Sequence, residues 1–380
     1  MEIKSIDGYW NLYEIIEIEN GITKLPKNYK NDGKYKFLDY KNVYKKDTIH
    51  DFQYNFLPKI NIFEKDYKNK YKSQKNSIAI TWTSETNIDI FQATFINTNK
   101  PLVLNGFCKI FKIRDKFPIL PQWLTWYLNF DKHIKKIRKS IPYTTRCNMT
   151  INELKHMYIK KCDLVTQQKI INIIEPFELL KQNFYNKKNK LINLINYLYK
   201  YNSQNSDKEN YLLSMTNLFN KKYENQNMYI ETSNINENMS ITNKIKEISK
   251  NKKPSRANLS PKNNSLIFAK LRGSQKIFPI YDKKYTNYVY STGFYNISAN
   301  DLDWYLLGFL NSKDFIIQKN NNSSGTLMQG ITIKDLNKIK IKIPKNKYKL
   351  NSIVKTISKI NLVIETIDEI ISNLIELSVI

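Results

Sequence analysis

The chain has 380 residues, with 61 Lys and Arg against 34 Asp and Glu, and its formal net charge is +27. This length allows two domains of ordinary size, and a 41% share of hydrophobic residues is enough to bury their cores, which excludes a disordered protein. A surface this positive attracts polyanions, so nucleic acid is the leading partner. The alternative is that AT-rich coding, which favours Lys, Asn, Ile and Tyr, produced the charge.

Three cysteines, Cys108, Cys147 and Cys162, stand far apart and form no C-x-x-C pair. An odd number of separate cysteines is typical of a reducing compartment. The first residues lack the apolar core of a signal peptide, and no stretch approaches the roughly 20 apolar residues of a membrane span. The sequence therefore predicts a cytoplasmic protein that is not embedded in a membrane.

The first half of the chain contains three signals in succession. Residues 77–82, which follow Asn76 and a Lys/Asn-rich turn, predict a strand. Residues 122–128 predict an aromatic helix, in which Trp123 and Trp126 have helical spacing and are interpreted as packing residues rather than base-stacking platforms. Residues 150–155 then carry the pattern Thr-Ile-x-acid-Leu.

A long heptad pattern follows this motif and predicts a helix from about Gln167 to Lys200. Such a helix is about 50 Å long, which exceeds one turn of DNA at about 34–36 Å. Pro176 is expected either to kink the helix or to separate residues 166–175 as a turn. The predicted apolar seam consists of Ile170, Phe177, Phe184, Leu191 and Leu198 at one position and Ile173, Leu180 and Leu194 at the other, interrupted by Lys187.

The second half repeats this order of elements. A strand is predicted at residues 265–270 and an aromatic helix around Trp304 and Tyr305, and Thr-Ile-x-acid-Leu recurs at residues 332–336, 182 positions after its first copy. Two repeats with two seams imply two globular heads and two helices that pair as a coiled coil. The alternative is that each helix packs on its own head as an ordinary amphipathic helix. The second seam consists of Leu350, Ile357, Ile364 and Ile371 with Ile353, Ile360, Ile367 and Leu374.

Polar residues cluster on the turns that follow and precede these elements. Base edges offer donors and acceptors in the major groove and phosphates attract cations, so hydroxyls, amides, Lys and Arg on turns are the candidate DNA contacts. A solvated turn or a structural cap is the alternative for each of them. The candidates are Thr83, Ser84, Thr86, Thr144, Thr145 and Arg146 in the first half, and Ser255, Arg256, Lys270, Arg272, Ser274 and Gln275 in the second.

Catalytic signatures are absent from the sequence. It contains neither the glycine-rich cofactor loop and Asn/Asp-Pro-Pro-aromatic tetrad of an amino-methyltransferase nor a phosphate-binding G-x-x-x-x-G-K loop. The histidines His50, His133 and His156 are scattered, without metal-ligand spacing. We therefore expect no catalytic residues, no cofactor and no metal.

Several segments resemble the specificity subunits of Type I restriction–modification systems. Residues 10–21 with 36–43 are similar to the opening of a family recognition domain, and Pro254-Ser255-Arg256-Ala257 with the strand at 265–272 is similar to the family's Pro-Ser-Arg-Ala and strand-to-Arg segments. Residues 324–332 resemble the Gly-Thr turn before the final strand. The first head lacks Pro-Ser-Arg-Ala, so the two heads are expected to read different half-sites.

The resemblance implies an α+β fold in which two pseudo-repeated α/β target recognition domains are joined by two long helices, packed as an antiparallel coiled coil. The implied boundaries are a first recognition domain at 1–165, a central spacer helix at 166–203, a second recognition domain at 204–345 and a C-terminal spacer helix at 346–380.

The implied function is sequence-specific binding of a bipartite target in double-stranded DNA by a noncatalytic subunit. Two methyltransferase subunits, and restriction subunits with them, would be the partners that perform adenine methylation or cleavage. The alternatives are a stand-alone DNA-binding nuclease and a coiled-coil adaptor that binds nucleic acid.

Overall fold

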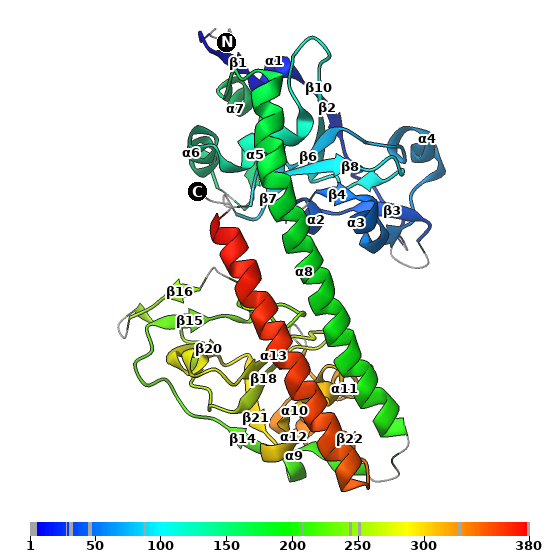
Figure 1. The fold of residues 1–380 in the computed structure, drawn as a ribbon, viewed down its shortest axis with the longest axis vertical. Helices are drawn as coiled ribbons and strands as arrows, with labels where there is room; N and C mark the ends of the chain where they lie inside the picture. The colour runs from blue at the N-terminus through cyan, green and yellow to red at the C-terminus, as the bar shows by residue number, and fades with distance from the viewer. Residues whose placement is uncertain are drawn as a thin grey trace. The chain divides into compact units, whose positions relative to one another are not determined.

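The computed structural model describes residues 6–27, 29, 33–44, 48–86, 89–143, 145–204, 206, 209–242, 245–249, 252–325 and 329–377. They form two compact units, unit 1 up to Leu179 and unit 2 at Leu180–Leu377. The long helix α8 (Leu164–Gln204) runs from the first into the second (Figure 1). No helix in the described ranges combines the length and the apolar character that crossing a membrane requires.

Unit 1 is built on a sheet in the order β2-β10-β6-β8-β4. Its central strand β6 (Ser77–Thr81) is buried along its whole length, because helix α5 (Pro121–Phe130) packs on it. Trp123 and Trp126 of α5 are buried in the same core, which confirms their predicted packing role. The other strands of the sheet are β2 (Ile16–Asn20), β10 (Cys108–Ile113), β8 (Ala93–Asn97) and β4 (Ile49–His50).

A smaller sheet and several short helices complete unit 1. The sheet has the order β5-β3-β9, with β3 and β9 parallel. These elements are β3 (Tyr35–Leu38), β5 (Lys59–Ile60), β9 (Val103–Leu104), α1 (Leu12–Ile15), α2 (Tyr40–Tyr44), α3 (Asp51–Phe56), α4 (Tyr67–Lys70) and α6 (Lys132–Ser140).

Unit 2 repeats the plan with a sheet in the order β14-β21-β18-β19. Helix α10 (Asp303–Leu310) packs on the buried strand β18 (Ser265–Ala269), and Tyr305 of this helix is fully buried, which confirms the packing interpretation. A second sheet has the order β16-β15-β20-β17. The remaining elements are β14 (Asn217–Phe219), β21 (Phe294–Ser298), β19 (Ile277–Ile280), β15 (Met228–Ile230), β16 (Lys246–Glu247), β20 (Tyr288–Ser291), β17 (Ala257–Leu259), α9 (Leu212–Met215) and α11 (Lys313–Asn321).

Matching backbone hydrogen bonds establish the repeat. The amide N of Leu12 donates to the carbonyl of Met157 at 2.9 Å, and that of Leu212 donates to Ile339 at 2.8 Å. Each pair joins a strand near the start of the unit, β1 (Tyr9–Asn11) or β13 (Glu209–Tyr211), to one near its end, β12 (Tyr158–Lys160) or β22 (Lys340–Lys342).

The two Thr-Ile-x-acid-Leu motifs are helix starts. Thr150 and Thr332 cap α7 (Ile151–Lys155) and α12 (Ile333–Leu336), because each hydroxyl accepts a hydrogen bond from the backbone N–H three residues later. This equivalence explains why the motif recurs. The predicted α+β class with two repeated units is confirmed.

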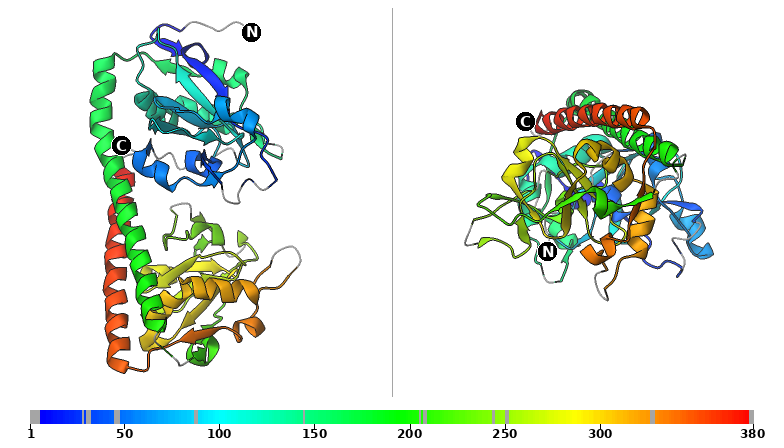
Figure 2. Two further views of the ribbon diagram at one scale, coloured as in Figure 1. Left: turned by 90° about the vertical axis from the view of Figure 1, so that its right-hand side faces the viewer. Right: turned by 90° about the horizontal axis from the view of Figure 1, so that it is seen from below.

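The unit 2 part of α8 packs against α13 (Lys347–Leu377), and the two helices are antiparallel (Figures 1 and 2). Lys188, near the beginning of this stretch, meets Asp368 near the end of α13, whereas Tyr201 lies near Lys349 at its beginning. The seam predicted for α13 is confirmed, since all eight of its Leu and Ile side chains are buried.

The seam predicted for α8 is wrong at four of its eight positions, whereas Ile170, Phe184, Leu191 and Leu198 are partly buried. Ile173 is 65% exposed, and Phe177, Leu180 and Leu194 are exposed as well. The helix instead turns a partly polar stripe inward, formed by Gln182, Lys188, Ile192, Ile195 and Tyr199.

Two contacts determine that α8 buries this face rather than the predicted one. Gly308 of α10 has no side chain, so α8 approaches closely and Tyr199 packs against it, where a Cβ at position 308 would lie 3.0 Å from the Cβ of Tyr199. Lys188 is fully buried and finds a carboxylate, Asp368, in α13. The helix is continuous through Pro176, so a separate turn at residues 166–175 is also wrong.

Lys188 and Asp368 form the central polar contact of the helix pair. The ammonium lies 2.7 and 2.6 Å from the two carboxylate oxygens, and 2.6 Å from the Ser240 hydroxyl. Burial lowers the pKa of Lys188 and raises that of Asp368, and their mutual attraction opposes both shifts.

Replacing Lys188 by Met should lower the free energy of unfolding by about 1–3 kcal/mol, because it leaves the half-buried Asp368 without its cation. Combining it with Asp368→Leu should restore most of the loss. The matched control is Lys187→Met at the exposed neighbouring position, which should change stability by less than about 0.5 kcal/mol. Urea unfolding of the full chain measures all three, and equal losses for the single and double variants would contradict the pairing.

Candidate nucleic-acid interface

The structure brings the two groups of candidates in unit 1 together. Strand β7 (Thr83–Ser84) pairs with β11 (Cys147–Asn148), so the residues after β6 lie beside those before Thr150. We call the surface formed by residues 82–86, 105–107, 143 and 145–148 the unit 1 edge. Thr144 lies outside the described residues.

The candidates on the unit 1 edge differ in exposure. Thr86, Thr145 and Arg146 are exposed, and Thr83 is half-buried. Ser84 is buried, accepts a hydrogen bond from the Tyr40 hydroxyl at 2.8 Å, and accepts another from the amide of Thr86 at 3.1 Å. The structure thus gives Ser84 the role of supporting Thr86.

Two aromatic residues on this edge were missed in the sequence. Phe107 is 47% exposed, and the guanidinium carbon of Arg146 lies 5.2 Å from the centre of its ring. Tyr143 is exposed too, and its backbone bridges to Cys147. An available signal was the turn sequence Asn105-Gly106, which places Phe107 at a loop tip.

The candidates in unit 2 also lie together. The amide of Thr292 donates to the carbonyl of Arg256 at 2.9 Å, and the amide of Lys270 donates to Gly293 at 2.9 Å. These bonds join the turn at 254–257 to the turn at 270–275 through residues 291–293. We call these three segments, with residues 329–330, the unit 2 edge.

Most candidates on the unit 2 edge reach solvent. Ser255, Arg256, Arg272 and Gln275 are exposed and Ser274 is half-buried, whereas the half-buried Lys270 places its ammonium 4.3 Å from the centre of the Tyr295 ring. Arg272 bonds the Gln329 side chain, and its amide donates to the Gln329 carbonyl at 2.9 Å.

Two residues of helix α11 hold the 270–275 turn in place through hydrogen bonds. Gly273 has φ +76°, a left-handed conformation that suits glycine, and its amide donates to Oδ1 of Asn320 at 2.8 Å. The buried ammonium of Lys319 donates to the carbonyl of Ala269 at 3.2 Å and to that of Ser274. Burial lowers the pKa of Lys319 to about 8.

The two edges occupy equivalent positions in the repeat. The amide of Met149 donates to the carbonyl of Trp82 at 2.9 Å, and the amide of Ile331 donates to Lys270 at 3.0 Å. The Trp82 amide in turn donates to Phe107 at 2.8 Å, as Lys270 does to Gly293. Phe107 and Gly293 are therefore equivalent positions with different side chains.

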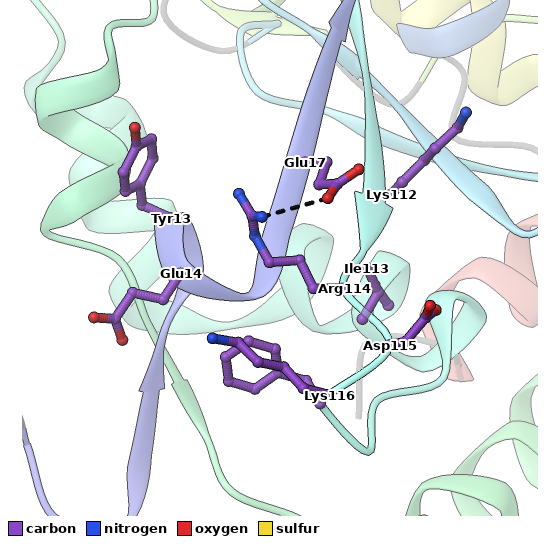
Figure 3. Close-up of a pocket in the computed structure, with 9 residues that line it drawn as sticks. Tyr13, Glu14, Glu17, Lys112, Ile113, Arg114, Asp115 and Lys116 are labelled. Carbon is purple, nitrogen blue, oxygen red and sulfur yellow. Dashed lines mark hydrogen bonds and ion pairs between the residues drawn. The ribbon is translucent and has the colours of Figure 1, made fainter.

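Unit 1 also contains a cavity of about 800 Å³, and Figure 3 shows residues that line it. None of the twelve candidate contacts lines it. Arg114 points at Glu17, with a contact of 3.3 Å, and Lys112 pairs with Glu19 at 2.6 Å. Burial opposes ionisation of Glu19, but Lys112 and Lys72 lower its pKa to about 2. Two of the three cations that line the cavity, Lys112 and Arg114, are thus paired with carboxylates, so we assign no DNA contact to it.

No family model matches the chain, and no curated protein matches it. Among solved structures, the chain is similar to S subunits of Type I restriction–modification systems. The S subunit from M. genitalium has 13% identity and a TM-score of 0.48, covering 97% of this chain and 93% of that one. Sequence identity this low says nothing about which bases or partners this chain binds.

Two further structures are similar over almost the same length. A chain from a study of complex assembly and conformational transition of the type I R-M system has 12% identity and a TM-score of 0.37, with 99% and 96% coverage. The HsdS subunit from Thermoanaerobacter tengcongensis has 12% identity and a TM-score of 0.33, with 98% and 95% coverage.

The titration of Lys319 gives a pH prediction. Its folded pKa of about 8 lies below the ordinary 10.5, so the unfolded chain binds the proton more tightly. The free energy of unfolding should therefore rise by up to about 3 kcal/mol between pH 8 and 10.5. Below pH 8 this contribution to stability is lost completely.

Comparison of unfolding curves for the wild type and Lys319→Met isolates this slope, since the variant should lack it. Lys313→Met, at an exposed position of the same helix, is the matched control and should keep it. Parallel pH profiles for the wild type and Lys319→Met would show that the ammonium is not buried in solution.

Proposed function

We propose that this chain is the noncatalytic specificity subunit of a Type I restriction–modification complex. It binds double-stranded DNA in the cytoplasm at a bipartite target, with unit 1 reading one half-site and unit 2 the other. Residues 1–165 and 204–345 act as the recognition domains, and residues 166–203 and 346–380 act as spacer helices. Methylation of adenine and cleavage belong to its partner subunits.

The observation that carries this proposal is the equivalence of the two edges. The same backbone framework presents Phe107 in unit 1 where Gly293 stands in unit 2, and Ser84 in unit 1 where Arg272 stands in unit 2. Two copies of one framework with different side chains suit a target whose halves differ in sequence. The net charge of +27 supplies the attraction to phosphates.

The long helices offer surface for partner subunits. Besides the side chains that they bury, both helices carry exposed apolar residues, which associate with other apolar surfaces. We assign these faces to the docking of two methyltransferase subunits, to which the restriction subunits would be added. The exposed residues include Ile173, Phe177, Leu180, Leu194 and Tyr197 on α8, and Leu362 and Val363 on α13.

Co-expression with the partner methyltransferase tests the function. Single-molecule sequencing of the host DNA should find methylated adenine at one split sequence. Arg272→Ala should make one base of one half-site degenerate, at a cost of about 1–3 kcal/mol in discrimination, while the other half-site stays unchanged.

Two outcomes would contradict the proposal. One is methylation at a continuous short site or at no site. The other is cleavage of a plasmid into specific fragments by the pure chain with Mg²⁺, which would favour a stand-alone nuclease.

The spacer role predicts the effect of a longer α8. Seven residues inserted between Leu179 and Leu180 add about 10 Å of helix, or about three base pairs. The gap between the half-sites should lengthen while both half-sites keep their sequence. The control is a seven-residue insertion in the surface loop after Glu224, which should leave the gap unchanged. Altered half-sites in the α8 variant would show that reading and spacing are not separate.

A further inference from the structure

The backbone of Phe107 is held by hydrogen bonds although its side chain is exposed. The amide of Phe107 donates a hydrogen bond to Oδ1 of Asn105 at 2.8 Å. Its carbonyl accepts hydrogen bonds from the amides of Trp82 and Thr83 at 2.8 and 3.1 Å. Gly106 packs against the backbone of Ile22, where a Cβ would lie 2.5 Å from the carbonyl oxygen. The ring therefore projects into solvent from a turn whose backbone is fixed.

Arg146 lies over this ring. Its guanidinium carbon is 5.2 Å from the ring centre, a distance at which a cation is attracted to an aromatic face. Among the described residues Arg146 makes no ion pair, so its planar N–H fork stays available. Stacking restricts the side chain before DNA arrives, which lowers the entropy lost on binding.

Guanine is the base that matches such a fork. Its N7 and O6 both accept hydrogen bonds in the major groove, and a guanidinium binds them as a pair. An apolar ring beside the guanidinium matches the only apolar group on that groove, the C5-methyl of thymine.

We propose that Phe107 and Arg146 form one reading element, in which Arg146 binds N7 and O6 of a guanine while Phe107 contacts the methyl group of an adjacent thymine. The inference rests on the proposed function and names the bases that unit 1 reads. Unit 2 lacks the element, because Gly293 stands at the position of Phe107. The half-site read by unit 1 therefore contains a thymine next to a guanine.

The test uses the chain bound to its methyltransferase and duplexes that carry the methylated sequence. Replacing that thymine by uracil removes only the methyl group and should weaken binding by about three- to fourfold in the wild type. Replacing the guanine by 7-deazaguanine removes N7 and should weaken it about five- to tenfold. Phe107→Ala should be insensitive to uracil, and Arg146→Met, which keeps a long side chain without N–H groups, should be insensitive to 7-deazaguanine.

A matched control distinguishes base recognition by Phe107 and Arg146 from the general effect of removing an exposed aromatic side chain near a cation. Phe130 is also an exposed ring of unit 1, with Lys135 at 5.5 Å from its centre, and Phe130→Ala should respond to both base analogues as the wild type does. Phe107→Tyr, which keeps the ring, should retain the response to uracil. Unchanged reading of the other half-site shows that each variant is folded.

Three results would overturn the inference. They are a unit 1 half-site without an adjacent thymine and guanine, an equal weakening of the wild type and Phe107→Ala by uracil, and an equal weakening of the wild type and Arg146→Met by 7-deazaguanine. A bipartite target with any of these results leaves the proposed function intact. A target that is not bipartite would instead remove the proposed function itself.

Discussion

The register of the helix pair depends on one buried ion pair. The isoleucines along the α13 seam resemble one another, so apolar packing alone would accept shifts by a heptad. Such a shift would place Lys188 against the buried Asn361, which cannot neutralise an ammonium that is cut off from water. Only Asp368 does so, and Ser240 ties a loop of unit 2 to the same point. One cation therefore joins α8, α13 and that loop at a single point.

The repeat separates what is constant in each unit from what varies. Backbone hydrogen bonds from Trp82 and Lys270 hold equivalent turns, and backbone bonds do not depend on side-chain identity. Phe107 can thus correspond to Gly293 without a change in the fold. A surface held in this way can vary its base contacts while the sheet and the helix beneath it stay the same.

The sequence predicted those features that repeat or have a regular period. The α13 seam is apolar at every position and was correctly identified, as were the strands after Asn76 and Asn264. The α8 seam was identified at only half of its positions, because the buried stripe also contains Gln182 and Lys188, and a hydrophobic period cannot identify a polar residue that is buried through a distant partner. Pairing between Thr83 and Asn148 and the place of Phe107 also depend on contacts far apart in the chain.

The burial of Lys319 lowers the stability of the fold but holds one turn in place. An apolar side chain there would avoid the burial of an ammonium, which lowers its pKa to about 8. The ammonium, however, donates to two carbonyls, of Ala269 and Ser274, at the two ends of the turn that carries Arg272. A neutral apolar residue could fill the space but could not hold both ends. Stability is thus sacrificed for the geometry of one turn, a compromise that is typical of functional sites.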